Sequence, residues 1–239
     1  MIGMGFGPVK GPEPAFAHVK LLSWLAKLMR LGALTPLLLL ASRSPHRAAV
    51  LQRLGAPFLT ADSAIDETPR PGESPAARAA RLALEKAQRV ASTWPGAGPA
   101  LVIGGDQVAH HEGKILRKPG TLERARAHLL GSRGRWVTFE SALAVVHSAS
   151  GAYETGQCAV RVRFADLTEG EIDAYLAQEQ PLDAAGALYS EKLGAVLLDR
   201  WEGADPSALI GLPLHLLHTL TKALGWPLLG TPWPPVPTA

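Results

Sequence analysis

Two apolar segments, each followed directly by a polar motif, constrain most strongly how this chain can fold. Leu37–Ala41 runs into Ser42–Arg47, and Ala100–Gly104 runs into Gly105–Gln107. Short apolar runs are typical of strands buried on both faces, although periodicity alone does not separate them from buried helical segments. The polar motif that follows each run distinguishes the two possibilities, and on this basis we interpret both runs as strands.

Helical and strand-like patterns alternate along the rest of the chain and predict an α/β fold. Pro45 in the first turn and Gly55 at the end bracket one helix. Thr168 and Glu171 have the spacing of a capping box. Further helices are expected at Ser74–Trp94, Thr121–Leu130, Thr168–Gln178 and Pro213–Leu224. Further strands are expected at Pro57–Thr60, Val137–His147, Tyr153–Phe164, Gly194–Trp201 and Ala208–Ile210.

We expect one domain over residues 37–229, an extension at 1–36 and a Pro-rich, disordered tail at 230–239. The extension has the basic and apolar character of a signal peptide, but charged residues and Pro36 interrupt it. Its apolar run is also too short to span a bilayer, so we expect no membrane association. An amphipathic helix near Val19–Leu31 is our interpretation of the extension, and Met29 as the true start is a further hypothesis.

Charge and cysteine content limit the classes of partner and compartment. The formal net charge of +3 lies entirely within residues 1–36, and the remainder holds equal numbers of basic and acidic residues. A nucleic-acid surface needs clustered basic charge, so we expect no nucleic-acid partner. The single cysteine, Cys158, cannot form an internal disulfide. A buried, unreactive thiol and a cytoplasmic location are therefore expected.

The motif Ser42–Arg47 lies at a junction between a strand and a helix N-terminus. Backbone N–H groups and the helix dipole favour an anion there, and Ser hydroxyls and Arg side chains can add hydrogen bonds. The alternative is a helix cap with two solvated arginines. The motif thus indicates a candidate phosphate site.

Asp106 follows the second apolar run and is expected at the C-terminal end of that strand. Ligands of open α/β sheets bind at such ends. A carboxylate there could hold a divalent cation or act as general base, and the alternative is an Asp that caps a turn.

Several other charged residues are candidates of lower specificity. Glu67 and Glu73 could bind magnesium, and Lys86 and Lys118 could hold phosphate, although each is more often a solvated surface charge. Adjacent residues of a strand point to opposite faces, so His110 and His111 are expected in a solvated hairpin rather than at one metal ion.

Taken in order, these segments resemble the Maf family of nucleotide pyrophosphatases. The matches spread over residues 37–226 and are more specific together than any single motif. They comprise Leu40–Arg47, Asp66-Glu67, Glu73–Lys86, Ile103–Val108, Lys118-Pro119, Pro181–Gly186, Ser190-Glu191, Gly194, Glu202–Pro206 and Ile210–Leu214.

The resemblance implies a Maf/inosine-triphosphatase-like fold, with a mixed sheet and two lobes around a central cleft. It implies hydrolysis of a nucleotide between its α- and β-phosphates, with magnesium or manganese as cofactor. By position, Asp106 would be the general base and, with Glu67, would bind the metal. Phosphates would be held by Ser42, Arg47, Lys86 and Lys118. Homodimer formation stays open.

The resemblance also implies a substrate. The branch of the family that acts on 7-methyl-GTP has Glu where this chain has Glu191, whereas the branch that acts on dTTP and UTP has Gln. A carboxylate only accepts hydrogen bonds, and the Watson–Crick edge of guanine offers adjacent N–H donors. His46, Gln107 and Glu191 would therefore set specificity, with the His46 ring stacked on the base.

Gly105, Ala184 and Tyr189 depart from the pattern, where this branch usually has Ser, Cys and Lys. The departures at Gly105 and Tyr189 concern recognition of the substrate rather than the chemistry. The alternatives are the same reaction on dTTP, UTP or another modified nucleotide, and a nucleotide-binding regulator of septum formation.

Overall fold

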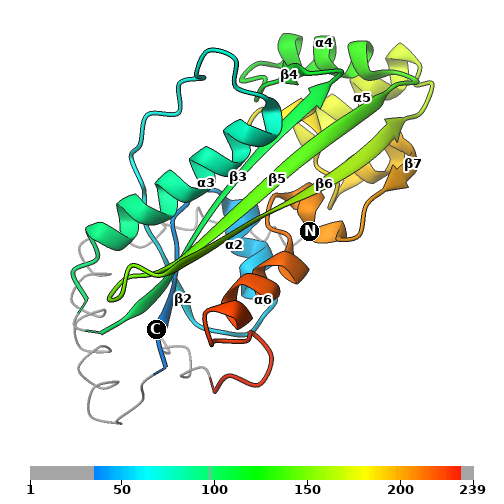
Figure 1. Cartoon of the computed structure of the whole chain (residues 1–239). Coiled ribbons are helices and arrows are strands. Elements are labelled where there is room, and N and C mark those ends of the chain that lie inside the picture. The colour runs from blue at the N-terminus through cyan, green and yellow to red at the C-terminus, as the bar shows by residue number, and fades with distance from the viewer. Residues whose placement is uncertain (1–34, 97, 233–239) are drawn as a thin grey trace, which may run out of the picture.

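The protein is described by a computed structural model over residues 35–96 and 98–232 (Figure 1). The predicted helix near Val19–Leu31, the hypothesis about Met29 and most of the predicted tail lie outside the described residues. Seven strands form one mixed sheet in the order β2-β1-β3-β5-β6-β7, with β4 paired to the end of β3. The mixed α/β fold is therefore confirmed.

The long antiparallel strands form the centre of the sheet, and the short parallel strands lie at one edge of it. The strands are β1 (Leu37–Leu40), β2 (Phe58–Thr60), β3 (Ala100–His111), β4 (Lys114–Leu116), β5 (Trp136–His147), β6 (Tyr153–Phe164) and β7 (Leu198–Glu202). The α-helices are α2 (Pro45–Gln52), α3 (Pro75–Ser92), α4 (Leu122–Ser132), α5 (Glu169–Glu179) and α6 (Leu214–Ala223). The 3₁₀ helices are η1 (Ala185–Ala187), η2 (Leu193–Leu197) and η3 (Pro206–Ile210).

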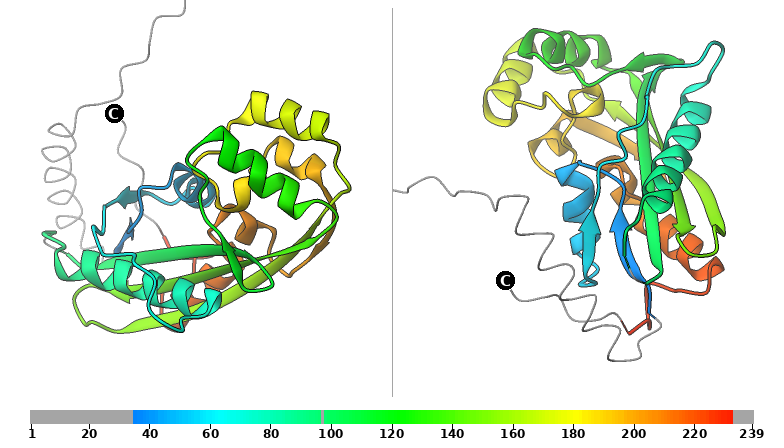
Figure 2. Two further views of the ribbon diagram at one scale, coloured as in Figure 1. Left: turned by 90° about the horizontal axis from the view of Figure 1, so that it is seen from above. Right: turned by 90° about the vertical axis from the view of Figure 1, so that its left-hand side faces the viewer.

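The core consists of three clusters of buried residues. Two of them lie on opposite faces of the same strands, because the side chains of a strand alternate between its two faces. On one face, apolar residues of β1, β3 and β5 pack against α3, which runs along the long strands (Figures 1 and 2). On the other face, the alternate residues of the same strands pack against α2 and α6. The far ends of β5 and β6 pack against α4 and α5 in the third cluster.

Four of the helices begin with a Ser or Thr cap. The hydroxyls of Ser44, Ser74, Thr121 and Thr168 each accept a hydrogen bond from the backbone N–H three residues later. The capping box of Thr168 and Glu171 is present. These bonds satisfy N–H groups that have no partner inside the helix.

The predicted strand at Ala208–Ile210 is wrong, because this segment forms η3. Pro206 occupies the first turn, and the Asp205 carboxylate accepts hydrogen bonds from the Ser207 N–H at 2.9 Å and the Ser207 hydroxyl. Gly211, at φ 99°, ends the turn. The predicted strand at Gly194–Trp201 is right only in its second half, since Leu193–Leu197 is also a 3₁₀ helix.

The predicted position of Asp106 at a strand end is also wrong, because Asp106 lies in the middle of β3. Pairing with β5 carries β3 through Gly104 and Gly105 without interruption. On its other edge, β3 pairs with β1 only as far as Ile103 and with β4 only from Ala109. Asp106 therefore lies at a gap between two partners on the same edge of β3.

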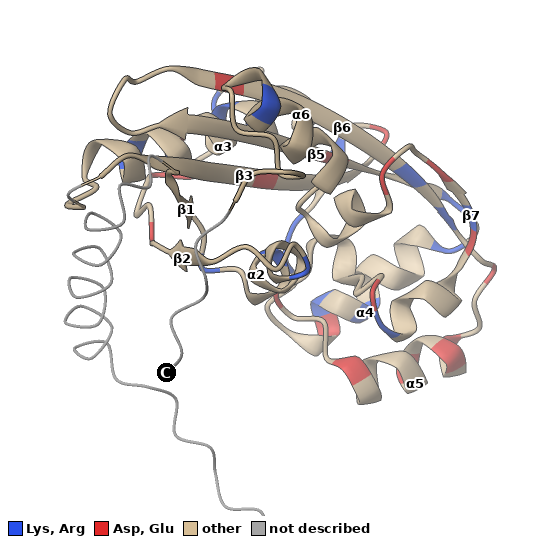
Figure 3. Ribbon diagram, turned by 90° about the horizontal axis from the view of Figure 1, so that it is seen from below, with Lys and Arg blue, Asp and Glu red and all other residues tan. Residues whose placement is uncertain are grey.

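Basic and acidic residues are interspersed along the ribbon (Figure 3), in keeping with the even balance after residue 36. No helix within the described ranges is long and apolar enough to cross a membrane.

Candidate active site

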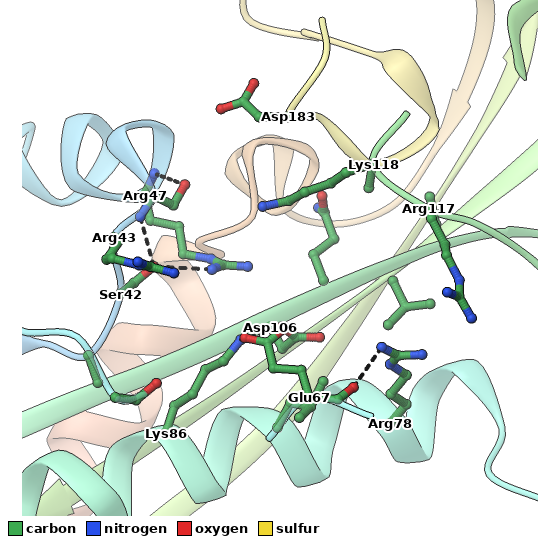
Figure 4. A pocket seen from close by; sticks show the side chains of 18 of the residues that line it. Ser42, Arg43, Arg47, Glu67, Arg78, Lys86, Asp106, Arg117, Lys118 and Asp183 are labelled. Atoms are coloured by element: carbon green, nitrogen blue, oxygen red, sulfur yellow. Dashed lines mark hydrogen bonds and ion pairs between the residues drawn. The ribbon is translucent and has the colours of Figure 1, made fainter. Parts of the chain in front are cut away.

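A cavity of about 510 Å³ opens at the gap beside β3. Its walls come from the turn before α2, the loop after β2, α3, the middle of β3 and the segment after β4 (Figure 4). A smaller cavity of about 70 Å³ adjoins it, and the two share the lining residues Ser44, Arg47, Gln107, Lys118, Asp183 and Ala185. The two cavities therefore form one cleft with a larger and a smaller compartment.

Asp106 and Glu67 converge on Lys86 at the floor of the larger cavity. The Lys86 Nζ atom lies 2.8 Å from Oδ1 of Asp106 and 2.8 Å from Oε1 of Glu67. The side chains of Lys86 and Asp106 are buried, whereas that of Glu67 is 54% exposed. Burial alone would raise the pKa of Glu67, but the hydrogen bond from Lys86 and nearby cationic charges lower it below its ordinary value.

This arrangement suits a divalent cation, because two carboxylates already point at one positively charged atom. Magnesium commonly takes one or two carboxylates and completes its shell with substrate phosphates and water. Among residues 35–96 and 98–232, no group of three or more His, Cys, Asp or Glu side chains is arranged to hold a metal. Glu67 and Asp106 would thus depend on the substrate for further ligands.

The turn Ser42–Arg47 faces the same cavity as Asp106, as the phosphate hypothesis requires. Arg47 donates from Nη1 to the Ser42 hydroxyl at 3.3 Å and from Nε to the Gly211 carbonyl at 3.0 Å. Burial lowers the pKa of Arg47, although the charges of Asp106 and Glu67 act in the opposite direction. Arg43, by contrast, is 82% exposed and pairs with Asp62 at 3.4 Å.

Lys118 lines both compartments. It is exposed, and no hydrogen bond or ion pair is found for it within the described part of the chain. Its charge helps to lower the pKa of Glu67 and of Asp183. Its ammonium group is therefore available to a ligand at the junction of the two compartments.

The smaller compartment brings together the residues expected to set specificity. Nδ1 of His46 lies 2.8 Å from Oε1 of Glu191, and Nε2 lies 3.7 Å from Oδ2 of Asp183. The His46 ring lies 4.8 Å from the Tyr189 ring at a tilt of 31°. The Tyr189 hydroxyl donates to Asp183, and burial together with that carboxylate raises the pKa of Tyr189.

Gln107 is oriented by η3. Its Nε2 atom donates to the Ala208 carbonyl at 2.6 Å and to the Leu209 carbonyl at 3.2 Å. These acceptors fix which end of the amide is the nitrogen. The Gln107 carbonyl oxygen is therefore the end that remains for a ligand.

Among the charged residues of the cleft, sequence reasoning missed four, namely Asp62, Arg78, Arg117 and Asp183. A signal for Arg78 was available, because Arg78, Leu82 and Lys86 are spaced four apart on one face of α3 and all line the cavity. Arg117 and Asp183 lie in irregular segments, where no periodicity indicates which way a side chain points.

Some candidates lie outside the cleft. His111 Nδ1 bonds to the Trp136 carbonyl at 2.8 Å, and His110 lies 3.6 Å from a Glu140 oxygen. Cys158 is a free, partly buried thiol on β6, and burial raises its pKa. Glu73 is also absent from the cavity lining, because it pairs with Arg81 through two bonds of 2.5 and 2.8 Å.

The pair of Glu73 and Arg81 is expected to stabilise the fold in a pH-dependent way. Arg81 and the Arg70 backbone N–H lower the pKa of Glu73 from 4.5 to about 2. A carboxyl group whose pKa is lower in the folded than in the unfolded protein stabilises the fold at pH values above its ordinary pKa. This contribution is lost as the pH falls from about 4.5 to about 2. We expect Glu73→Gln to lower the Tm at pH 7, and the difference from the parent to vanish towards pH 2.

Thermal unfolding between pH 7 and pH 2.5 measures this difference. Glu154→Gln is the matched control, because no ion pair is found for Glu154 in the part of the chain that the structure describes. A Tm difference for Glu73→Gln that stays constant across this range would contradict the prediction.

Comparison with known proteins identifies the family of this chain. The family model described as Maf-like protein matches residues 37–224. The 7-methyl-GTP pyrophosphatase of Burkholderia pseudomallei is 49% identical over 199 residues, 83% of this chain and 93% of that protein. The proteins of the same name from Burkholderia lata and a Polaromonas species are 48% and 50% identical, each over 196 residues. These cover 82% and 81% of this chain, and 93% and 88% of the relatives. The family model and the relatives both match most of the chain, and the chain therefore belongs to the Maf family.

Proposed function

We propose that the chain is a nucleoside triphosphate pyrophosphatase that hydrolyses 7-methyl-GTP to 7-methyl-GMP and pyrophosphate. One observation carries the proposal: Asp106 shares a cavity with the anion-binding turn of Ser42 and Arg47, and this cavity continues into the compartment of Glu191. A phosphate chain and a base could occupy the two compartments together. The names of the relatives support the same activity and the same substrate.

Asp106 would act as the general base. A water oxygen forms a bond to the α-phosphorus while one water proton passes to the Asp106 carboxylate. The bond between the α-phosphorus and its bridging oxygen breaks, and the electron pair stays on the leaving pyrophosphate. Ser42, Arg47, Lys86 and Lys118 would hold the phosphates, since positively charged donors stabilise the charge that develops on phosphate oxygens.

A divalent cation, magnesium or manganese, would be held by Glu67 and Asp106. When bound, it supplies Lewis-acid stabilisation of phosphate oxygens. Lys86 already lies between the two carboxylates, so its ammonium group balances their charge and keeps them converged on one point.

The smaller compartment would recognise the base. His46 holds one oxygen of Glu191, which leaves the other to accept from the adjacent N–H groups of guanine. The free carbonyl oxygen of Gln107 is a further acceptor. Methylation at N7 makes the base cationic, and the carboxylates of Glu191 and Asp183 lining this compartment favour a cation. The His46 and Tyr189 rings offer a surface for stacking.

The test is a pyrophosphate-release assay with magnesium or manganese over a panel of nucleotides. The panel contains 7-methyl-GTP, GTP, ITP, dTTP and UTP. The proposal expects the highest kcat/KM for 7-methyl-GTP and no release without a metal. Release from none of these nucleotides would overturn the enzymatic assignment. We place the enzyme in the cytoplasm, because the free thiol of Cys158 suits a reducing compartment.

Glu191→Gln is expected to reduce the preference for 7-methyl-GTP over dTTP by at least about tenfold. The amide turns one acceptor into a donor, which faces an N–H group of guanine but suits the mixed edge of thymine. The ratio of kcat/KM values for the two nucleotides measures the change. Glu154→Gln makes the same chemical change outside the cleft and should leave the ratio unaltered. An unchanged ratio in Glu191→Gln would contradict the role given to this carboxylate.

A further inference from the structure

Arg78 and Arg117 lie on the side of the larger cavity away from Ser42 and Arg43 (Figure 4). Arg78 comes from α3, and Arg117 comes from the segment after β4. Both side chains line the larger compartment, and neither lines the smaller one. The fold therefore brings two guanidinium groups into the larger compartment, on the side opposite Ser42 and Arg43.

The hydrogen-bonding capacity of these two side chains is largely unused. Arg78 donates from Nη2 to the Glu67 carbonyl at 3.0 Å, but its Nη1 atom is buried and has no partner among the described residues. Arg117 has no hydrogen bond or ion pair within the same ranges. A buried donor on a charged group is costly to leave unpaired, so Nη1 of Arg78 points to a missing acceptor.

The other cations of the cavity are differently placed. Lys86 is paired with two carboxylates, and Arg47 is bonded to Ser42 and Gly211. Arg43 is mostly exposed and paired with Asp62. Arg78, Arg117 and Lys118 also line this cavity and have no carboxylate partner among the described residues, and Lys118 lies at the junction of the two compartments.

We infer that Arg78 and Arg117 bind the β- and γ-phosphates of the substrate and hold the pyrophosphate as it leaves. The inference rests on the proposed function, which puts the base in the smaller compartment and the α-phosphorus beside Asp106. The two remaining phosphates then extend into the larger compartment. When the bridging bond breaks, its electron pair adds negative charge to the pyrophosphate, and two forked guanidinium groups stabilise that charge.

Calorimetric titration of the full-length protein with pyrophosphate and with 7-methyl-GMP, both in the presence of magnesium, tests the inference. We expect Arg117→Met and Arg78→Met each to raise the Kd for pyrophosphate by at least about tenfold, as loss of a charge-assisted contact does. The Kd for 7-methyl-GMP should change by less than about twofold, and Arg78→Lys should recover part of the loss. Arg89→Met is the matched control, because Arg89 is an exposed arginine of α3 that lines neither cavity, and this change should alter neither Kd.

Arg117→Met tests ligand binding without removing a structural contact, because Arg117 makes no hydrogen bond to another residue within the described ranges. Arg78, in contrast, donates a hydrogen bond to the Glu67 backbone. Unchanged pyrophosphate affinity in Arg117→Met and Arg78→Met overturns the inference, and so does an equal loss of affinity for 7-methyl-GMP. If the parent protein binds neither ligand and releases no pyrophosphate, the proposed function itself fails.

Discussion

Replacing Asp106 with Asn is expected to lower turnover of 7-methyl-GTP by about 10²–10⁴-fold, the range for loss of a general base. The amide has nearly the same shape as the carboxylate but cannot take a proton from water. The turn that carries Ser42 and Arg47 stays in place, because the hydrogen bonds of Arg47 do not involve Asp106. Binding of 7-methyl-GMP should therefore be retained while kcat falls.

Single-turnover release of pyrophosphate, with calorimetric binding of 7-methyl-GMP, separates these two effects. Asp199→Asn makes the same change on the surface of β7, where Asp199 pairs with Arg163, and should leave turnover intact. Turnover of Asp106→Asn within about tenfold of the parent would show that another group accepts the proton. If 7-methyl-GMP binding is lost as well, Asp106 holds the site together rather than acting on water.

The roles expected for the site residues depend on contacts between elements, and the sequence predicts the elements better than the contacts. The apolar runs and the Ser and Thr caps identify β1, α2, α3, α4 and α5, because these signals are local. The end of the apolar run predicts that the strand stops at Gly104, and glycine inside a strand does weaken an isolated strand. Long-range pairing with β5 overrides this preference and places Asp106 in mid-strand.

Local sequence patterns cannot predict which distant residues meet in the cleft. Glu191 and His46 are 145 residues apart in the sequence and 2.8 Å apart in the structure. Glu191 lies between η1 and η2, and 3₁₀ segments carry no clear period, so no local pattern places it beside α2. Resemblance to a family suggested that these residues act together, whereas the hydrogen bonds of Gln107 with η3 explain how one of them is held.

Gly104→Ala is expected to destabilise the protein by about 1–3 kcal/mol or more, as an overpacked core does. A Cβ atom at Gly104 would lie 2.1 Å from the Ala83 carbonyl oxygen and 2.8 Å from the Ala87 backbone nitrogen. Both are backbone atoms of α3 and cannot swing aside, so the helix itself has to move. Urea unfolding should show a lower midpoint with little change in slope.

Gly105→Ala is the matched control, because its Cβ would meet the end of the Leu143 side chain at 3.1 Å, which can adjust. The two glycines are neighbours on β3, so they differ mainly in which face they present. Gly104 and Asp106 face α3 together, and Lys86 on that helix lies 2.8 Å from Asp106. A shift of α3 should therefore also lower kcat per folded molecule, by separating Lys86 from the two carboxylates that it holds together. Equal unfolding midpoints for the two variants would contradict this account, because close approach of α3 at Gly104 is what sets the distance from Lys86 to Asp106.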